Sequence, residues 1–299
     1  MARRPVPPVH GMAVVDKAAD WTSHDVVAKA RGLLGTRKVG HAGTLDPDAT
    51  GVLVLGVGAA TRLLTYLSGL GKAYTGEVVL GTATSTLDAS GAVTGTWDMT
   101  AVGLDQVRAA AAGLTGDIAQ VPPMVSAKKV GGRRLHELAR EGVEVERAAV
   151  PVRVVRFDVG PPVEAGVFPV TVECSSGTYV RSLAADLGTA LGGGAHLRNL
   201  RRLSVGPFGL DEAVKLEELA PDRLLPPVEA LRGRPRVTVD ADLAVAVGHG
   251  KVLPAPVLGV TGEGPWAVLD DGGRLLAVYH RHKGDDVKPG VVLAPGPVS

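Results

Sequence analysis

Residues 40–51, GHAGTLDPDATG, place one acid, Asp46, directly before a proline, between two glycine-containing turns, and an apolar run follows at 51–57. Proline restricts the residue before it to extended backbone, and glycines at positions 43 and 51 permit tight bends or a close approach to a ligand. The run GVLVLGV predicts a buried strand. The segment is therefore either a simple Asp-Pro turn or a loop on a rigid strand that holds a carboxylate in place for chemistry.

The length and composition bound the class of protein. A chain of 299 residues predicts one large and one small folded unit. Its apolar runs are too short to span a bilayer, and its basic N-terminus lacks the apolar stretch of a secretory signal. Cys174 is the only cysteine, so no intramolecular disulfide can form, and no Cys/His cluster has zinc spacing. We expect a cytoplasmic protein.

Predicted strands and helices follow one another without a steady alternation, which favours an α+β fold over a doubly wound sheet. Short β-like runs with Asp-Gly and Gly-Gly turns indicate a small β-rich domain at 237–299, and the Pro- and Arg-rich segment 221–236 is interpreted as a linker. Hydrophobic spacing predicts strands at 12–16, 51–57, 74–80, 150–157 and 167–174, and helices at 22–35, 59–67, 104–114 and 178–191, with Ser23 as the cap of the first helix.

The net charge of +1 hides a regional basic surplus. Residues 1–75 carry nine Lys/Arg against five Asp/Glu, residues 125–160 carry eight against five, and residues 181–206 carry four against one. Each segment by itself is more typical of solvated surface. Three surpluses beside predicted loops favour a polyanionic partner.

A second candidate segment is CSSGTYVR, residues 174–181, in which Arg181 opens a predicted helix after a glycine turn. An arginine beside a carboxylate keeps it ionised and lowers its pKa by roughly one to three units. Tyr74 and Tyr179 both fall beside predicted loops, a placement that suits base stacking. The pair Gly56-x-Gly58 lacks the third glycine and the later acid of a dinucleotide fingerprint, so nucleotide binding there is disfavoured.

Four blocks occur in order along the chain and together resemble the successive motifs of the TruB family, the bacterial tRNA pseudouridine-55 synthases. The resemblance covers roughly residues 11–210, and the GHxGTLDPxATGVL block is highly specific. The four blocks are GHAGTLDPDATGVLVLGVGAATRL, KAYTGEVVLGTATSTLDASG, VPPMVSAKKVGGRRLHELAREG and CSSGTYVRSLAADLGTALGGGAHLRNLRRL.

The resemblance implies the pseudouridine synthase fold, which is α+β with a mixed, mostly antiparallel central sheet flanked by helices. A catalytic domain is expected at 1–230 and a small β-rich, PUA-like RNA-binding domain at 231–299. The implied activity is conversion of a uridine in the tRNA T-loop to pseudouridine. The implied partner is the T-arm of tRNA, with the protein acting as a monomer, without a membrane and without a small-molecule cofactor.

The resemblance also assigns roles residue by residue. Asp46 takes the place of the catalytic aspartate, Tyr74 that of the tyrosine stacked on the target uracil, and Arg181 that of the arginine paired with the aspartate. The other matches are Tyr179 and Leu200 in the pocket, His41 for contact with the T-loop as the base is extruded, and Lys128, Lys129, Arg133 and Arg134 in a segment that helps to grip the T-arm.

The chemistry agrees with these residue types. The uracil is detached from the ribose at N1, turned, and rejoined through C5, so no electron carrier or group donor is needed. An ionised carboxylate suffices as nucleophile or base, once the stacked base has been flipped into a pocket. Attack of Asp46 on the sugar, attack on the base ring, and removal of a sugar proton all remain open.

The first motif departs from the family pattern. The family usually has Lys-Pro-x-Gly, whereas this chain has Lys17-Ala18-Ala19-Asp20, and Val125 and His136 stand where aromatic residues are common. We expect these changes to affect the rigidity of the supporting shell and leave the catalytic set intact.

Two other classes of function are weighed against the synthase. One is a non-catalytic protein that binds or folds tRNA on the same scaffold, which the presence of Asp46, Tyr74 and Arg181 disfavours. The other is a glycoside hydrolase using Asp46 and Asp48, which is disfavoured because aromatic residues make up only 3% of the chain.

Overall fold

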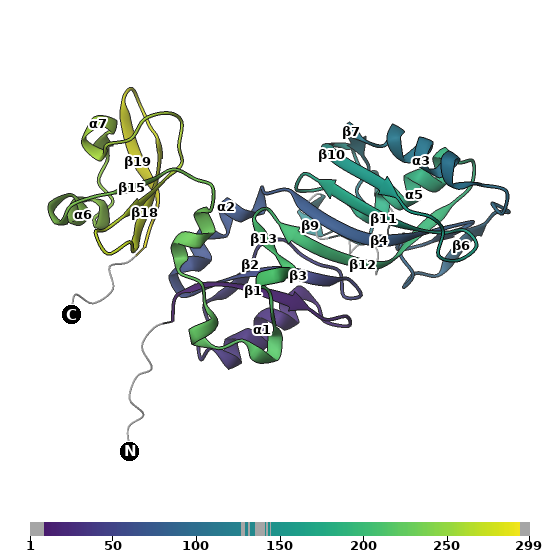
Figure 1. Cartoon of the computed structure of the whole chain (residues 1–299), viewed down its shortest axis with the longest axis horizontal. Coiled ribbons are helices and arrows are strands. Elements are labelled where there is room, and N and C mark those ends of the chain that lie inside the picture. Colours follow the sequence, from purple (N-terminus) through teal and green to yellow (C-terminus); the bar gives the residue numbers. More distant parts are fainter. Residues whose placement is uncertain are drawn as a thin grey trace, which may run out of the picture.

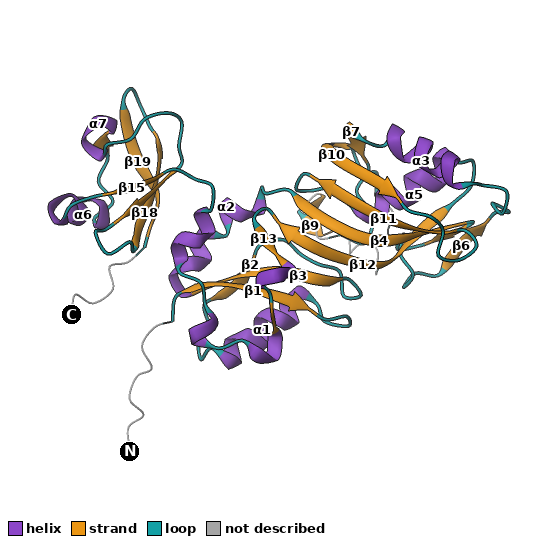
Figure 2. Cartoon of the chain, viewed as in Figure 1, coloured by secondary structure: helices purple, strands orange, loops and turns teal. Residues whose placement is uncertain are grey.

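The computed structural model describes residues 9–126, 129–130, 132–134, 141, 143 and 145–293. A large sheet unit makes up most of the molecule, and a smaller β-rich unit stands beside one of its ends (Figure 1). Both units are predominantly β, with short helices at their edges and on their faces (Figure 2).

A ten-stranded sheet forms the large unit. Its main path runs β14-β1-β3-β12-β4-β11-β10-β7, with β2 paired to β3 and β13 to β12. Only the β1–β14 and β3–β12 pairs of this sheet are parallel. The predicted α+β class and mostly antiparallel sheet are therefore confirmed. The strands are β1 (Gly11–Lys17), β2 (Val39–His41), β3 (Thr50–Val57), β4 (Lys72–Leu80), β7 (Gly116–Gln120), β10 (Val150–Val159), β11 (Val167–Cys174), β12 (Ala195–Val205), β13 (Phe208–Gly209) and β14 (Val214–Lys215).

Helix α1 (Ser23–Leu33) lies within the predicted range 22–35, but its N-cap is Thr22 and not the predicted Ser23. The Thr22 hydroxyl accepts from the Asp25 N–H, and the Asp25 carboxylate accepts from the Thr22 N–H, which makes a capping box. Ser23 is thereby free for another role: its hydroxyl accepts from the Leu45 N–H at 2.8 Å and donates to the Leu45 carbonyl at 3.2 Å. The first helix is thus tied to the loop that carries Asp46.

The helix predicted at 59–67 is broken into two short pieces, the 3₁₀ helix η1 (Gly58–Leu63) and one turn of α-helix, α2 (Thr65–Ser68). The Thr61 hydroxyl donates to the Gly58 carbonyl at 2.8 Å, a local bond that competes with the regular helical ladder. The predicted helices α3 (Leu104–Gly113) and α5 (Val180–Ala190) are present and pack on the sheet with a shared apolar core.

The interpretation of residues 221–236 as a linker is wrong for most of its length. The segment forms two 3₁₀ turns, η4 (Pro221–Arg223) and η5 (Pro227–Leu231), and the second buries Leu231 in the core. Between them, Leu225 and Met12 exchange backbone hydrogen bonds of 2.8 and 2.9 Å. Pro and Arg residues gave this packed segment the composition of a linker.

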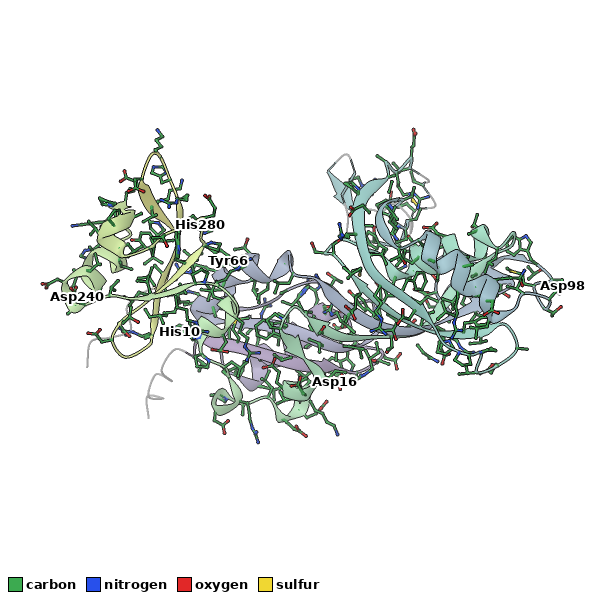
Figure 3. The ribbon with its side chains drawn as sticks, turned by 45° about the horizontal axis from the view of Figure 1, so that its top comes forward. His10, Asp16, Tyr66, Asp98, Asp240 and His280 are labelled. Carbon is green, nitrogen blue, oxygen red and sulfur yellow. The ribbon has the colours of Figure 1, made fainter. Side chains whose placement is uncertain are left out.

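A five-stranded sheet forms the small unit, in the order β15-β17-β18-β19-β16, which confirms the predicted β-rich C-terminal domain. One face of it continues the core of the large unit, since Ala267 and Val278 share an apolar cluster with Leu63 and Phe208. The side chains of Tyr66 and His280 point toward each other across this contact, 2.8 Å apart (Figure 3). The elements are β15 (Arg236–Thr238), α6 (Ala241–Gly248), β16 (Leu253–Pro254), α7 (Ala255–Leu258), β17 (Trp266–Leu269), β18 (Leu275–Arg281) and β19 (Asp286–Val292).

The altered first motif generates a stability prediction. Asp20 has a φ of +66°, in the left-handed region that glycine adopts more readily. We expect Ala18→Pro combined with Asp20→Gly to raise the free energy of unfolding by about 0.4–1 kcal/mol, because the proline restricts the unfolded chain. The glycine relieves backbone strain and also loosens the unfolded chain, so its net contribution is smaller. Denaturant melts of the double variant measure the change, and a lower midpoint would show that residue 18 has a backbone that proline does not fit.

Candidate active site

The loop between β2 and β3 is anchored on both sides of Asp46. On one side Leu45 is buried and its backbone is held by the Ser23 hydroxyl. On the other, the Pro47 carbonyl accepts from the Lys17 ammonium at 2.8 Å. The Ala49 N–H donates to the Asp46 carbonyl at 3.2 Å, so the Asp-Pro turn is formed as well. The loop therefore forms an Asp-Pro turn and at the same time holds the Asp46 side chain in place.

Lys17 is the altered first motif's link to this loop. Its side chain is buried, and its ammonium donates to the carbonyls of Ala18, Trp21 and Pro47 at 2.6–2.9 Å. Burial lowers the pKa of Lys17 to about 8, while Asp46 opposes this change. Three carbonyl acceptors match the three donors of an ammonium, so Lys17 is held in one position and supports the loop that carries Asp46.

Arg181 binds both oxygens of the Asp46 carboxylate. Its Nε lies 2.9 Å from Asp46 Oδ2 and its Nη2 lies 3.1 Å from Oδ1, which is the bidentate geometry typical of arginine–carboxylate pairs. The guanidinium is fixed in turn by the carbonyls of Thr86 and Val125, at 2.7 and 2.9 Å. Asp88 lies 3.6 Å away on the same nitrogen, Nε. The arginine is 5% exposed, so this is a buried, preset contact between residues 135 positions apart.

The pKa of Asp46 is raised above its ordinary value, mainly by burial, and Arg181 lowers it only in part. The negative charges of Asp88 and Asp48 raise it further. We expected Arg181 to lower the pKa of Asp46, but burial of the carboxylate raises this pKa by more than the arginine lowers it. The Asp46 side chain is still 37% exposed, because it faces a cavity and is not enclosed on every side.

This cavity has a volume of about 270 Å³ and brings most of the predicted pocket residues together. Tyr74 on β4 is buried, and burial raises the pKa of its hydroxyl. The backbone of Tyr179, at the start of α5, is held by the Gln120 side chain, with bonds of 2.8 and 3.1 Å. The predicted residues that line the cavity are Asp46, Tyr74, Tyr179, Arg181 and Leu200.

His41 lies beside the cavity and does not line it. It is at the end of β2, half-buried, with the His24 ring edge-on at 5.5 Å between ring centres. Burial lowers the pKa of His41, and the neighbouring His24 lowers it further. The imidazole is thus disposed to be neutral at the rim of the loop.

The predicted basic segment is described only in part. The hairpin of β8 (Lys129–Val130) and β9 (Arg133–Arg134) is present, and the exposed Arg133 pairs with Glu141 at 2.5 Å. Lys128 and His136 lie outside the described residues, as do the side chains of Lys129 and Arg134.

Lys72 and Arg202 also line the cavity, and sequence reasoning missed both. Each lies two residues from a predicted site residue on the same strand, Lys72 before Tyr74 and Arg202 after Leu200. Since strand side chains alternate between faces, that spacing was the available signal. A third missed residue is Asp88, which a turn brings to Arg181.

Comparisons with known proteins agree with this site. Residues 31–180 match the TruB family pseudouridylate synthase N-terminal domain, and residues 181–231 match the tRNA pseudouridylate synthase B C-terminal domain. The chain belongs to the TruB family. A protein of an Arthrobacter species named tRNA pseudouridine synthase B is 47% identical to it, over 95% of this chain and 97% of that protein. A protein of the same name from Streptomyces coelicolor is 49% identical, over 92% of this chain and 94% of that one.

The fold of this TruB family member also matches solved structures. A chain in a Cbf5-Nop10-Gar1 complex superposes with a TM-score of 0.74 and 26% identity, over 95% of this chain and 85% of that one. The family establishes the chain as a pseudouridine synthase, an isomerase of RNA. No helix within the described residues has both the length and the apolar character to cross a membrane.

The raised pKa of Asp46 predicts how the rate of this synthase falls at acid pH. Each open route starts from an ionised carboxylate, and a raised pKa means that the group is protonated early as the pH falls. We expect the single-turnover rate to fall with a midpoint above about 4, the ordinary aspartate value. Asp88→Asn removes a negative charge that raises this pKa, so the midpoint should move to lower pH. Rate measurements from pH 3 to 8 test both points, and a midpoint at or below the ordinary value would contradict the assignment.

Proposed function

We propose that the chain converts a uridine of the tRNA T-loop, at position 55, to pseudouridine, with Asp46 as the catalytic residue. The observation that carries the proposal is the Asp46 carboxylate, gripped at 2.9 and 3.1 Å by a buried arginine at the wall of a cavity that also presents Tyr74. The relatives that match nearly the whole chain are named for this substrate class, tRNA.

The reaction conserves every atom of the substrate. The C1′–N1 bond breaks, the ring turns, a C1′–C5 bond forms, and the proton lost from C5 is balanced by one gained at N1. A stacked base cannot undergo this exchange within the loop, so it is first flipped into the cavity. Tyr74 offers its ring to the uracil, and Leu200 and Tyr179 complete the walls.

Arg181 gives Asp46 its orientation and supports its charge against the burial that raises its pKa. Whether the carboxylate attacks the sugar, attacks the base or removes a sugar proton, the charged form is the reactive one. A non-catalytic tRNA-binding protein would have no use for a carboxylate held in this way beside a base-sized cavity. The retained Asp46–Arg181 contact therefore favours the enzyme over that alternative.

The wider interface is proposed to hold the T-arm. His41 at the loop rim would contact the T-loop as the base leaves it, and the basic segment 128–134 would grip the phosphates. The small C-terminal unit is proposed as a PUA-like RNA-binding domain beginning near residue 231, and the protein as a cytoplasmic monomer. Electrostatic contacts of this kind dominate the affinity of most RNA and DNA complexes.

Asp46→Asn should abolish pseudouridine formation while tRNA binding and folding remain. The amide keeps the shape of the carboxylate but loses its charge, so we expect a fall in rate of at least about 10²-fold. Purified protein and unmodified tRNA are incubated, and pseudouridine is mapped by reverse-transcription stops after carbodiimide treatment. The matched control is Asp48→Asn, an exposed acid of the same loop, which should stay within a few-fold of wild type. Turnover of Asp46→Asn within tenfold of wild type would overturn the role of Asp46.

Replacing Lys128 and Lys129 with alanine should flatten the salt dependence of tRNA binding. Each phosphate contact contributes about 0.7–0.9 to the slope of log affinity against log salt, so the loss of two contacts should reduce the slope by roughly 1.5. Affinities measured at several salt concentrations test this. Lys215→Ala serves as the control, because Lys215 is exposed within the acidic segment 207–230. An unchanged slope in the double variant would remove this segment from the interface.

A further inference from the structure

Arg202 is the largest fully buried side chain among the described residues, with an exposed fraction of 0%. It lies on β12 at the back of the cavity. Its Nε donates to the Val52 carbonyl at 2.7 Å, its Nη1 to Thr44 at 3.3 Å, and its Nη2 to Gly43 at 3.2 Å. Arg202 also stands opposite Tyr74 in the pairing of β12 with β4, and both residues line the cavity.

Arg202 forms no ion pair with a carboxylate of the described residues, and Asp46 acts on its charge only from a distance. None of the ion pairs formed by the described residues includes Arg202, whereas its neighbours Arg198 and Arg201 on the same strand are both paired with acids. A buried guanidinium without an acid partner is costly, even when its donors are satisfied by carbonyls. Packing alone would be served better by an apolar side chain, so the cation calls for a functional reason.

The neighbours of Arg202 come from parts of the site that are far apart in the sequence. Gly43 and Thr44 belong to the loop that carries Asp46, Val52 belongs to the strand that follows this loop, and Tyr74 pairs with Arg202 from β4. Gly51 lies directly on the Arg202 backbone: a Cβ there would be 2.1 Å from the Arg202 carbonyl oxygen. The loop that carries Asp46 and the residue Tyr74 are therefore both positioned by contact with Arg202.

We propose that Arg202 is a positioning residue of the isomerisation. It holds Tyr74 in fixed relation to the loop of Asp46, and it supplies the cavity with a positive charge that no ion pair among the described residues neutralises. This inference rests on the proposed function, because it assigns a role in the same cavity.

The charge acts where the reaction needs it. When the C1′–N1 bond breaks, its electron pair leaves with the uracil ring, so negative charge develops on the base in the cavity. A preset cation stabilises such charge without reorganisation at the moment of reaction. Arg181 is less suited to this task, because its charge is already engaged by Asp46 at 2.9 Å. Tyr74 pairs with Arg202 across β4 and β12, so a change at either residue acts on the same part of the cavity.

The test uses the full chain and unmodified tRNA under single-turnover conditions with the enzyme saturating. The variants are Arg202→Lys, Arg202→Gln, Tyr74→Phe and the Arg202→Lys/Tyr74→Phe double variant. Arg201→Lys is the matched control: it is the adjacent arginine, it forms a half-buried pair with Asp16 at 2.7 Å, and it does not line the cavity. Denaturant melts and tRNA affinities are measured for each variant.

We expect Arg202→Lys to slow the single-turnover step by about 10- to 100-fold, the usual loss for a misplaced reacting group, with tRNA affinity within a few-fold of wild type. Arg202→Gln, which keeps donors but loses the charge, should be slower still. The double variant should be no slower than the slower of its two parents, because both changes act on the same Arg202–Tyr74 pair. Arg201→Lys should keep the wild-type rate.

A wild-type rate for Arg202→Lys, or a double variant whose loss is the product of the two single losses, would overturn the inference. If both Arg202 variants fail to fold, Tyr74→Phe carries the test: a slower step with unchanged stability and affinity supports it, and an unchanged rate overturns it. A wild-type protein that forms no pseudouridine in tRNA would overturn the proposed function instead.

Discussion

The contact between Asp46 and Arg181 is the constraint on which the rest of the site depends. Forming it requires a loop after β2 and the first turn of α5 to meet, although 135 residues separate them. The arginine is held in place because the Thr86 and Val125 carbonyls accept from two of its other donors, and the loop is held in place by its contacts with Ser23 and Lys17. A buried ion pair is weak support for stability. Its presence here, with burial working against the carboxylate's charge, is better explained by chemistry.

Local signals in the sequence predicted what is local in the structure. The extended Asp-Pro turn, the apolar run of β3 and the α+β order of elements follow from proline, glycine and hydrophobic spacing, and the structure contains them. The predicted helix at 59–67 failed because the Thr61 hydroxyl competes for a backbone carbonyl. The linker at 221–236 failed because composition does not reveal that Leu231 inserts into a core built by distant strands. Both errors have a tertiary or side-chain cause that spacing does not record.

The candidate site shows the same division. Asp46 is suggested by its own loop, but its pairing with Arg181 came from a family resemblance, since nothing in residues 174–181 points to residue 46. The sign of the Asp46 pKa change was beyond sequence reasoning, because it is the balance between the surrounding walls and one guanidinium. Arg202 was missed for a simpler reason. An arginine in a predicted strand is expected on the surface, and only the fold shows that Arg202 is fully buried.

The charges that line the cavity do not cancel. Lys72, Arg181 and Arg202 stand against the single carboxylate of Asp46. Arg181 is neutralised by that carboxylate, and burial lowers the pKa of Lys72, which reduces its hold on a proton. Arg202 remains as a charge in the cavity lining that no ion pair of the described residues neutralises. A nucleotide brings its own negative phosphates to the mouth of such a cavity, and its base gains negative charge inside it during the reaction. The excess of positive charge is therefore unfavourable in the free protein, and it becomes favourable when a uridine in the cavity is being detached from its sugar.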